Sequence, residues 1–551
     1  MRSRLAQYII IAILVIIAYV PLAAGDFVFD DQTLIQDNSY ITQLQSLSSY
    51  LSQEDGIVAE QDKGLLHTGY YRPLVNVTYF LDYKLWGMKA YGFRITNLLL
   101  HLLACFLLYE LLFMLIGSRP EIFWAVLLFA VHPVHTETVS IIVSRNNILA
   151  TIFIIASFYA YIVWWQKGTS FAWAVSLLSF TGAVFSKEFG LMVLPVFFLY
   201  QRLLTEERGL GREIISYVPY LIILFIYLAL RKTVVSVPLY IPEDILLRIA
   251  YIPYLLAYNL KLIFLPYSLH SFAVLYPDSL LTPSVLGAFF LVIFLGISLY
   301  IKRKDSLLIF SVAAFFLTLL PVLNVINKAS VSLIAMRWLY LPMAFLSLAI
   351  VRLMTEVKLE VTWEKSAKRI VLLAVVVYFI AGSYTLNAHL WRDQETFLKQ
   401  EVVHFANKAY MGDYAEMMLK KKQYREAEYF FRQSLQKDPL LARDFINYGA
   451  LLIETKQPQK ALDALEKGRF LTMGHQDRAD WNNNMGAALT LLGNYKRAHE
   501  HFAKALSLDS QNVALHRNLA YLLLKEGRTE EAVQRLQISE KIKLKQSKRN
   551  N

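Results

Sequence analysis

The segment Tyr8–Ala24 reads YIIIAILVIIAYVPLAA, and the segment Gly25–Asp31 directly after it reads GDFVFDD. An uncharged apolar run of this length predicts a helix that spans a membrane. Two adjacent carboxylates, Asp30 and Asp31, therefore follow the point where this helix leaves the bilayer. Carboxylates are costly to desolvate at a membrane surface, so they either stay hydrated in a loop or carry out a function. Both interpretations are open at this point.

Similar apolar segments follow one another up to about residue 390. Hydrophobic residues make up 56% of the 551-residue chain and are concentrated in these segments, which indicates a polytopic membrane protein built as an all-α helical bundle. About eleven spans are predicted, at 8–24, 95–117, 121–137, 146–166, 170–186, 189–204, 214–231, 283–301, 306–323, 337–354 and 370–388.

Lysine and arginine set the predicted orientation, because loops rich in these residues stay in the cytoplasm. Arg2 and Arg4 precede the first span, and Lys302–Lys304 follow the span 283–301. We therefore predict a cytoplasmic N-terminus and a first span that is a retained anchor rather than a cleaved signal peptide. Such loops also account for the formal net charge of +12, so no nucleic-acid partner is predicted.

The apolar segment 248–268 is an exception, because it carries Asn259 and Lys261. A crossing here would reverse every later span and place Lys302–Lys304 outside. We predict instead that 232–282 is an external excursion in which 248–268 is re-entrant or interfacial.

Eleven crossings from a cytoplasmic N-terminus place residue 389 and the chain after it outside. Most of the informative polar residues then fall in external loops, which predicts one external active site. These loops are 25–94, His132–Ser144, Lys187–Glu188, 232–282 and 324–336.

The loop 25–94 is too long to be only a connection. Besides Asp30 and Asp31 it contains Arg72, whose alternative role is to reach the lipid headgroups. Arg337 begins a span from the outer face, where a guanidinium group suits bidentate binding of a phosphate.

The turn Val131–Glu137 contains His132, His135 and Glu137, which could bind a metal or form a hydrogen-bonding network. Pro133 prevents a regular helix through His135, and the spacing matches no known metalloenzyme motif. We favour the network and predict no metal site. Cys105 is the only cysteine, so an internal disulfide and a multi-cysteine zinc site are excluded.

The chain after about Lys408 has a period of 34 residues, with starts near 408, 442, 479 and 513. Small residues recur at the eighth position and alanine at the twentieth, which is the tetratricopeptide pattern of paired helices. We therefore predict a membrane domain at 1–390, a connector at 391–407 and an α-solenoid of about four repeats at 408–551. Such arrays bind peptides or proteins in a groove. The recurring residues are Ala415, Gly449, Gly486 and Ala520, and Ala427, Ala461, Ala498 and Ala532.

Taken together, these motifs resemble the transmembrane and tetratricopeptide repeat-containing O-mannosyltransferase family. The resemblance covers nearly the whole chain and favours a bacterial relative. It rests on Phe29–Asp31, Tyr71–Pro73, Asn97 with His101, His132–Glu137, Lys187–Glu188, Arg337 with Leu339, Tyr340 and Pro342, and Trp391–Asp393.

The resemblance implies a membrane glycosyltransferase of the C-type fold that uses a lipid-phosphate sugar donor. It also implies that the catalytic acid lies in the first external loop, which matches Asp30 and Asp31. The chain departs from the family pattern at Arg94, at Met336 and within Ser144–Asn147. These departures leave the sugar open as mannose or another hexose.

The hypothesis for the reaction is that a hydroxyl group, of Ser or Thr in a protein, attacks the anomeric carbon of a polyprenyl-phosphate sugar with inversion. Asp30 or Asp31 accepts the proton as general base. No cofactor is required by the sequence, and a divalent metal is left open. The donor phosphate is assigned to Arg337, Arg72, Arg145 and Lys187, and the acceptor or a polar network to His132, His135, Glu137 and Glu188.

Two alternatives stay open. A transferase of the same fold could act on a lipid or an envelope glycan, or a non-catalytic membrane scaffold could work through its repeats. We expect an integral multi-pass protein of a bacterial inner membrane with external repeats, or of the endoplasmic reticulum if the chain is eukaryotic.

Overall fold

The computed structural model describes residues 2–36, 38, 41, 70–206, 210–235, 244–267, 269, 277, 279–323, 333–356, 364–407, 410–436, 441–471 and 473–550. In these residues every regular element is a helix and no β-strand is present. The predicted external loops 25–94, 232–282 and 324–336 lie partly outside the described residues. The chain folds into two compact units. The first ends at Phe397, and the second is formed by Leu398–Asn551. This boundary falls inside the predicted connector 391–407.

The first unit is a bundle of helices joined by short 3-10 and π-helical turns. Its elements are α1 (Arg2–Tyr19), η1 (Val20–Ala24), η2 (Gln32–Gln36), α4 (Pro73–Trp86), α5 (Ala90–Ile116), α6 (Pro120–Val131), η3 (Pro133–His135), α7 (Thr136–Ser140), η4 (Ile142–Ser144), α8 (Arg145–Lys167), α9 (Ser170–Ser186), η5 (Glu188–Met192), α10 (Val193–Leu203), α11 (Leu210–Val234), α12 (Ile245–Ala250), α13 (Ile252–Phe264), α14 (Pro283–Ile301), α15 (Ser306–Leu319), η6 (Leu320–Val322), η7 (Met336–Leu339), α16 (Tyr340–Glu356), α17 (Glu364–His389) and α18 (Gln394–Lys399).

Eight of the predicted spans correspond to helices that are long and apolar enough to cross a membrane. Within the described residues seven are continuous, and the eighth is the pair formed by α6 and Pro133–Ser140, which bends by 47°. The continuous ones lie at Arg4–Ala24, Ala90–Ile116, Ile142–Lys167, Ile214–Val234, Pro283–Ile301, Met336–Met354 and Ser366–His389.

The other three predicted spans are shorter helices. α9 has 17 residues and α10 has 11, and Ser306–Val322 is also a short apolar helix. At a rise of 1.5 Å per residue, α10 is roughly 16 Å long, against about 30 Å for the hydrocarbon core. The structure therefore supports seven or eight spans by length, and the predicted number of eleven is not confirmed.

The segment 248–268 forms two short helices, α12 and the 13-residue α13. α13 is roughly 20 Å long and thus shorter than the hydrocarbon core. Its end is fixed at the bundle, because the carbonyl of Ile263 is hydrogen-bonded to His132 at 3.0 Å. That this segment is re-entrant or interfacial stays a prediction.

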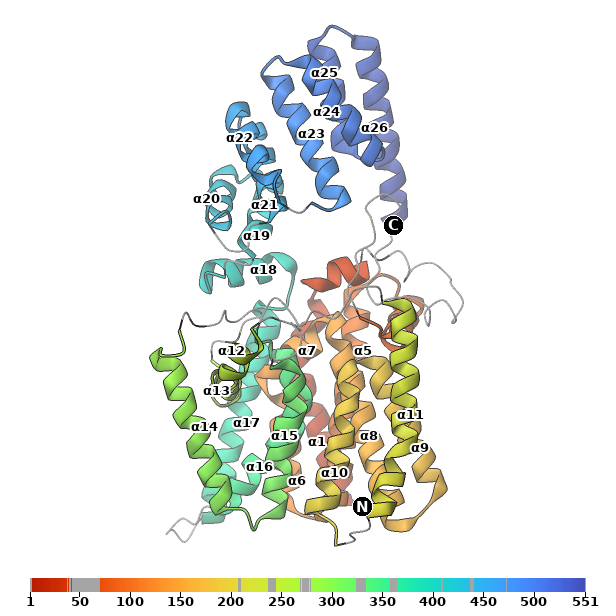
Figure 1. Ribbon diagram of the computed structural model, residues 1–551, viewed down its shortest axis with the longest axis vertical. Coiled ribbons are helices and arrows are strands. Elements are labelled where there is room, and N and C mark those ends of the chain that lie inside the picture. The colour runs from red at the N-terminus through yellow and green to blue at the C-terminus, as the bar shows by residue number, and fades with distance from the viewer. Residues whose placement is uncertain are drawn as a thin grey trace. The chain divides into compact units, whose positions relative to one another are not determined.

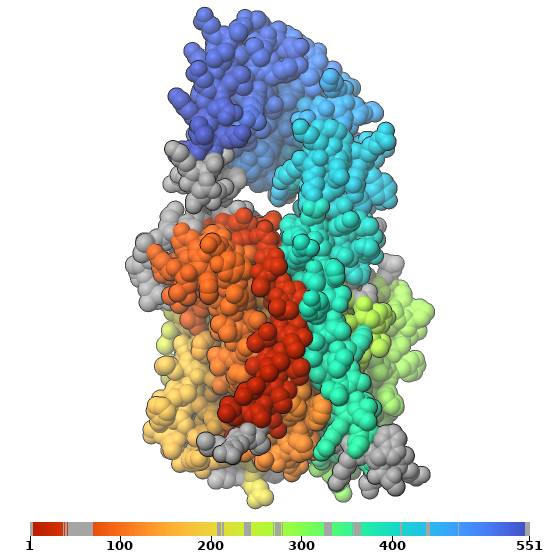
Figure 2. Space-filling view, turned by 180° about the vertical axis from the view of Figure 1, so that it is seen from behind, coloured from red at the N-terminus to blue at the C-terminus, as the bar shows by residue number. Residues whose placement is uncertain are grey.

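The long helices run alternately between two ends of the first unit (Figure 1). One end carries Asp31, Arg145 at the start of α8, Lys187 after α9 and Arg337 before α16. We call it the site end. The opposite end carries the turns after α8 and α14, and we call it the turn end. α1 lies between α5 and α17 on the face shown in Figure 2.

Burial separates a central pair of helices from peripheral ones. In the spans that contain α8 and α16, 72% and 78% of the residues are buried inside the bundle. Only 17% of α11 and 11% of α14 are buried. Because α14 is apolar on every side, its exposed surface is suited to lipid rather than water.

The bend between α6 and η3 gives structural roles to two of the motif residues, Pro133 and His101. Pro133 has no N–H group, so the helix ends at Val131 and frees two carbonyl groups inside the bundle. His101 is hydrogen-bonded to the carbonyl of Ala130 at 2.9 Å, and Ser383 donates to that of Val131 at 2.9 Å. The prediction that Pro133 interrupts the helix is confirmed, and the freed backbone groups are satisfied by side chains.

The second unit is an array of four helix pairs, as the repeat period predicts. Its elements are η8 (Gln400–His404), α19 (Met411–Lys420), α20 (Tyr424–Ser434), α21 (Ala442–Glu454), α22 (Pro458–Gly468), α23 (His475–Leu491), α24 (Tyr495–Leu508), α25 (Val513–Lys525) and α26 (Thr529–Asn550).

The small residues of the repeats lie where paired helices are closest. A Cβ atom added at Gly449 would lie 2.8 Å from Leu465, and one at Gly486 would lie 2.7 Å from the ring of Phe502. Both partners stand at the twenty-fourth repeat position. The predicted close approach of the paired helices is therefore present.

We predict that Gly486→Ala destabilises the repeat array, although alanine favours helices. The new methyl group would collide with the Phe502 ring, and overpacking of this kind costs about 1–3 kcal/mol. Hydrogen exchange of α23 and α24 in the full chain should become faster. Gly287→Ala is the matched control, since a Cβ there meets no atom within 4 Å. Unchanged exchange in Gly486→Ala would contradict the close packing.

Candidate functional site

The two carboxylates after the first span are presented by a strained and anchored loop. Phe29 has a φ of 59°, in the left-handed region that bulky residues avoid. Its N–H donates to Oε1 of Gln394 at 2.7 Å, and its ring lies 5.7 Å from that of Phe397. The N–H of Asp26 donates to the carbonyl of Arg392 at 2.8 Å. The conformation of Phe29–Asp31 thus depends on the chain after α17.

Asp31 is a structural carboxylate. Its side chain is fully buried, and its two oxygens accept the N–H groups of Ile142 at 3.0 Å and Val143 at 2.9 Å. Burial raises the pKa of Asp31 to about 7, although the two N–H donors and Arg94 act in the opposite direction. Asp31 therefore fixes the turn before α8 to the loop that follows the first span.

Asp30 differs from its neighbour in having no committed partner. Its side chain is half-buried, and within the described residues its carboxylate accepts no hydrogen bond. Burial raises the pKa of Asp30 to about 6, while Arg337 lowers it and Glu137 raises it. A partly exposed carboxylate beside a cation is available to a reacting group.

Arg337 is held next to Asp30 by Glu137. The fully buried Glu137 carboxylate accepts the backbone N–H of Arg337 at 2.9 Å and forms an ion pair with its guanidinium group. Arg337 keeps 18% of its side chain exposed. Glu137 is therefore engaged in positioning Arg337.

Lys187 and Glu188 lie close to Asp30, Glu137 and Arg337, and together these residues form what we call the charged cluster. Lys187 Nζ donates to Oδ1 of Asn147 at 2.5 Å and lies 4.3 Å from the centre of the Phe189 ring. Burial first, and then the nearby cations Arg72 and Arg337, hold the pKa of Lys187 well below its usual value. An approaching anion would favour the charged form of this amino group.

Arg72 joins the cluster through Glu188. Its Nε and Nη2 donate to Oε2 of Glu188 at 3.3 and 3.0 Å, and its guanidinium group stacks on Tyr70 at 4.0 Å. Pro73 begins α4 directly after it, which suits the first helical position. Burial acts to raise the pKa of Glu188, but Arg72 lowers it overall.

The charged cluster borders a small cavity of about 10 Å³ between α8, α15 and α16. Its polar wall consists of Asn147, Lys187 and Arg337. Its apolar wall includes Ile154 and Leu341. The two cations suit the anionic head of a ligand, while the space beside them holds about one water molecule and no apolar tail.

Arg145 does not join this cluster. Its buried guanidinium group donates to Asp82 at 2.5 Å, to Asn97 at 2.6 Å and to the carbonyl of Phe93 at 2.9 Å. A buried, enclosed guanidinium group has no face for a donor phosphate. The geometry gives Arg145 a structural role between α4, α5 and α8, and we no longer propose it as a phosphate ligand.

The two histidines of the bent span also have structural positions. His132 Nδ1 accepts the N–H of Val134 at 3.1 Å while Nε2 binds the carbonyl of Ile263, so both ring nitrogens are used. His135 is fully buried among aromatic rings, 4.7 Å from Phe129 and 4.8 Å from Tyr340. Among the described residues, no three His, Cys, Asp or Glu side chains are grouped to hold a metal ion.

Sequence reasoning missed the supporting role of Asp82 and Arg94. Asp82 pairs with Arg145, and nothing in its surroundings in the sequence distinguishes it from a surface residue of α4. Arg94 is buried and donates to the carbonyl of Asp26, which places it behind the acidic loop. Gly25 leaves room for it, since a Cβ there would lie 1.6 Å from the guanidinium group.

Comparison with known proteins gives one matching family model and a set of similar curated proteins. A family model described as tetratricopeptide repeat matches residues 489–542. A protein O-mannosyl-transferase of Caenorhabditis elegans is 33% identical over 204 residues, which cover 35% of this chain and 28% of that protein. The protein O-mannosyl-transferase TMTC4 of Homo sapiens is 33% identical over 192 residues, covering 31% of this chain and 26% of that protein. This chain resembles protein O-mannosyl-transferases.

The resemblance indicated by the motifs is therefore confirmed, and residues 489–542 match the predicted repeat pattern. The matched segments span less than a third of the length of either relative. Among solved structures, ArnT from Cupriavidus metallidurans bound to undecaprenyl phosphate is 12% identical with a TM-score of 0.40, covering 93% of this chain and 80% of that one. No conclusion about this chain follows from a likeness of that size.

We predict that Asp31→Ala destabilises the first unit and that Asp30→Ala does not. Removing Asp31 leaves the buried N–H groups of Ile142 and Val143 without acceptors, at a cost of about 1–3 kcal/mol each. Hydrogen exchange at these two amides should become faster, and the thermal midpoint should fall. The Asp30 variant is the matched control. Equal stability of both variants would contradict the division of roles.

Proposed function

We propose that the chain is a membrane glycosyltransferase that moves a hexose, with mannose as the first candidate, from a polyprenyl-phosphate donor to a hydroxyl group of Ser or Thr in a protein. The observation that carries the proposal is the unpartnered, half-buried carboxylate of Asp30 beside Arg337 at the site end. The similarity to protein O-mannosyl-transferases supports the class of reaction.

The proposed reaction is a single displacement. The acceptor oxygen forms a bond with the anomeric carbon while the bond between that carbon and the phosphate oxygen breaks with inversion. Asp30 accepts the proton of the hydroxyl group, and the phosphate leaves with the bonding electron pair. A pKa of about 6 leaves Asp30 mostly ionised at neutral pH and basic enough to take the proton.

The charge that develops on the leaving phosphate requires cations. Arg337 and Lys187 line the same cavity and are the proposed phosphate ligands. Arg72 acts one step away, because it is paired with Glu188 at 3.0 Å.

The donor class and the side of the membrane are part of the proposal. Loops rich in lysine and arginine lie at the turn end and predict that the site end is external. Nucleotide sugars are scarce outside the cytoplasm, which favours a lipid-linked donor. The repeats are proposed to recruit or present the protein acceptor.

We predict that Asp30→Asn lowers the rate of sugar transfer by about 10²–10⁴-fold, because loss of a general base has effects of this size. The assay supplies polyprenyl-phosphate mannose to membranes that contain the chain and measures labelled mannose in protein. Arg303→Gln at the turn end is the matched control, since it also changes one charge. Unreduced transfer in Asp30→Asn would contradict the assignment of the base. Labelled lipid or glycan, with unlabelled protein, would favour the other acceptor classes.

We predict that the transfer rate falls as the pH is lowered through about 6. The base acts in its deprotonated form, and burial raises its pKa from its usual value to about 6. Below that pH the rate should drop about tenfold per unit, while above about 7 it should be constant. A rate that stays constant down to pH 5 would show that a carboxylate of ordinary pKa, or none, accepts the proton.

A further inference from the structure

Helix α14, in the last third of the first unit, is mostly exposed, with only 11% of its span buried. α14 has no charged residue, and only Val285 and Ala288 near its start are buried. Its large apolar side chains from Phe289 to Ile301 are exposed, except for a half-buried stripe at Val292, Leu295 and Leu299. Its main packing partner is α13, which lies near its first residues. The second half of α14 therefore presents a large apolar surface that the bundle covers on one stripe only.

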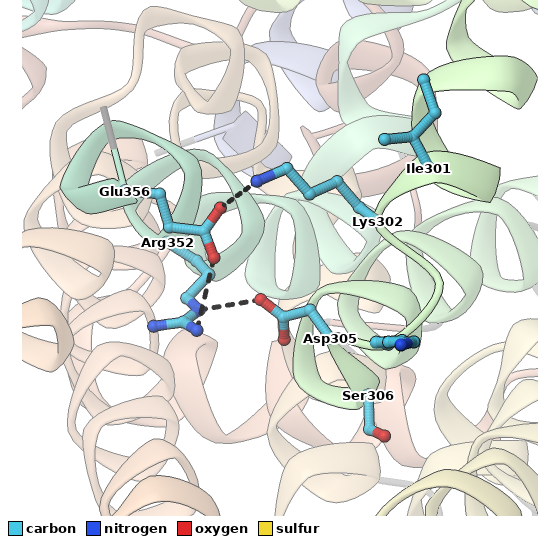
Figure 3. Close-up of a pocket in the computed structure, with 7 residues that line it drawn as sticks. Ile301, Lys302, Asp305, Ser306, Arg352 and Glu356 are labelled. Atoms are coloured by element: carbon cyan, nitrogen blue, oxygen red, sulfur yellow. Dashed lines mark hydrogen bonds and ion pairs between the residues drawn. The ribbon is translucent and has the colours of Figure 1, made fainter. Parts of the chain in front are cut away.

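At the turn end, α14 is attached by charges rather than by packing. Lys302 Nζ pairs with Oε2 of Glu356 at 2.7 Å, where α16 ends. Arg352 pairs with Oδ2 of Asp305 at 3.0 Å and with Oε1 of Glu356 at 3.3 Å. Figure 3 shows these ion pairs linking the end of α14 to α16 across the start of α15.

These groups surround an open cavity of about 550 Å³, a size that suits a lipid headgroup. Lys302, Lys304 and Arg352 supply three cations to its lining, and Asp305 and Glu356 supply two carboxylates. Both carboxylates are engaged in the ion pairs described above. Lys304 is exposed and has no ion-pair or hydrogen-bond partner among the described residues.

The neighbouring Arg303 adds a further positive charge near this cavity. It folds back on Tyr300, with its guanidinium group 4.2 Å from the ring centre. The surroundings of the cavity therefore carry an excess of positive charge, and the helix above it has an exposed apolar surface. A ligand that matches both features has an anionic head and apolar chains.

We propose that this cavity binds the phosphate headgroup of an anionic phospholipid, whose acyl chains lie along the exposed second half of α14. The acyl chains cover apolar surface of α14 that the protein itself leaves exposed. Lys304 contacts the phosphate, and Lys302 and Arg352 line the opposite walls. This site lies one full length of α16 away from Arg337 and does not depend on the proposed transfer reaction.

The lipid fits this place better than a protein partner for two reasons. The predicted cytoplasmic orientation of the turn end puts the cavity at the level of the headgroups, where anionic lipids are attracted by lysine and arginine. The apolar surface of α14 also lies in a helix long and apolar enough to span the membrane, so acyl chains are its natural neighbours.

The test is a titration of the purified full chain in neutral detergent with phosphatidylglycerol or phosphatidylcholine, followed by native mass spectrometry. We expect phosphatidylglycerol to bind more tightly. Lys304→Gln should weaken its binding about fivefold, from about 1 kcal/mol per basic residue. Because Lys304 has no partner among the described residues, this variant should fold normally. The double variant Lys302→Gln/Lys304→Gln should weaken binding about 30-fold.

Lys167→Gln is the matched control, an exposed lysine at the turn end that does not line the cavity. Its affinity for phosphatidylglycerol should equal that of the unchanged chain. Equal binding of the two lipids, or equal effects of Lys304→Gln and Lys167→Gln, would overturn the proposal. Displacement of phosphatidylglycerol by inorganic phosphate at the same concentration would also overturn it, because the site would then select the anion alone.

Discussion

The site depends on one buried contact, the pair of hydrogen bonds from Ile142 and Val143 to the carboxylate of Asp31. This contact ties the loop after the first span to the turn that begins α8. Because the two carboxylates are neighbours, fixing Asp31 inside the protein turns Asp30 toward Arg337. The left-handed conformation of Phe29 and its hydrogen bond to Gln394 complete this arrangement. One acid is used for structure, and the other stays available for chemistry.

A second constraint is that an irregular backbone inside a bundle must find partners for its polar groups. Pro133 breaks the span that begins with α6, and side chains from α5 and α17 bind the carbonyl groups that are released. Asn97 donates to the carbonyls of Val139 and Ile141 in the same way. The break directs Glu137 toward Arg337, so the proline, His101 and Asn97 all contribute to the position of the charged cluster.

Much of this organisation could be predicted from the sequence, because hydropathy, repeat spacing and the order of short motifs are local signals. The repeat period placed Gly449 and Gly486 at close helix contacts, and Pro133 indicated the broken helix. The different roles of Asp30 and Asp31 could not be predicted, since adjacent residues of one type look the same until their partners are known. In the sequence Arg145 stands at a helix start like a free cation, but in the structure it is buried and forms an ion pair with Asp82, which is far away in the sequence. The spans were overcounted because apolar composition also suits short helices such as α10.

The central claim is that Asp30 is the base of a glycosyl transfer to protein, and the most direct measurement is mass spectrometry of intact glycopeptides from the cell envelope. Cells that carry the unchanged chain are compared with cells that carry Asp30→Asn, at equal amounts of folded protein. The account predicts that a hexose disappears from defined Ser or Thr residues in the variant. An identical set of glycopeptides in both cell types would contradict it.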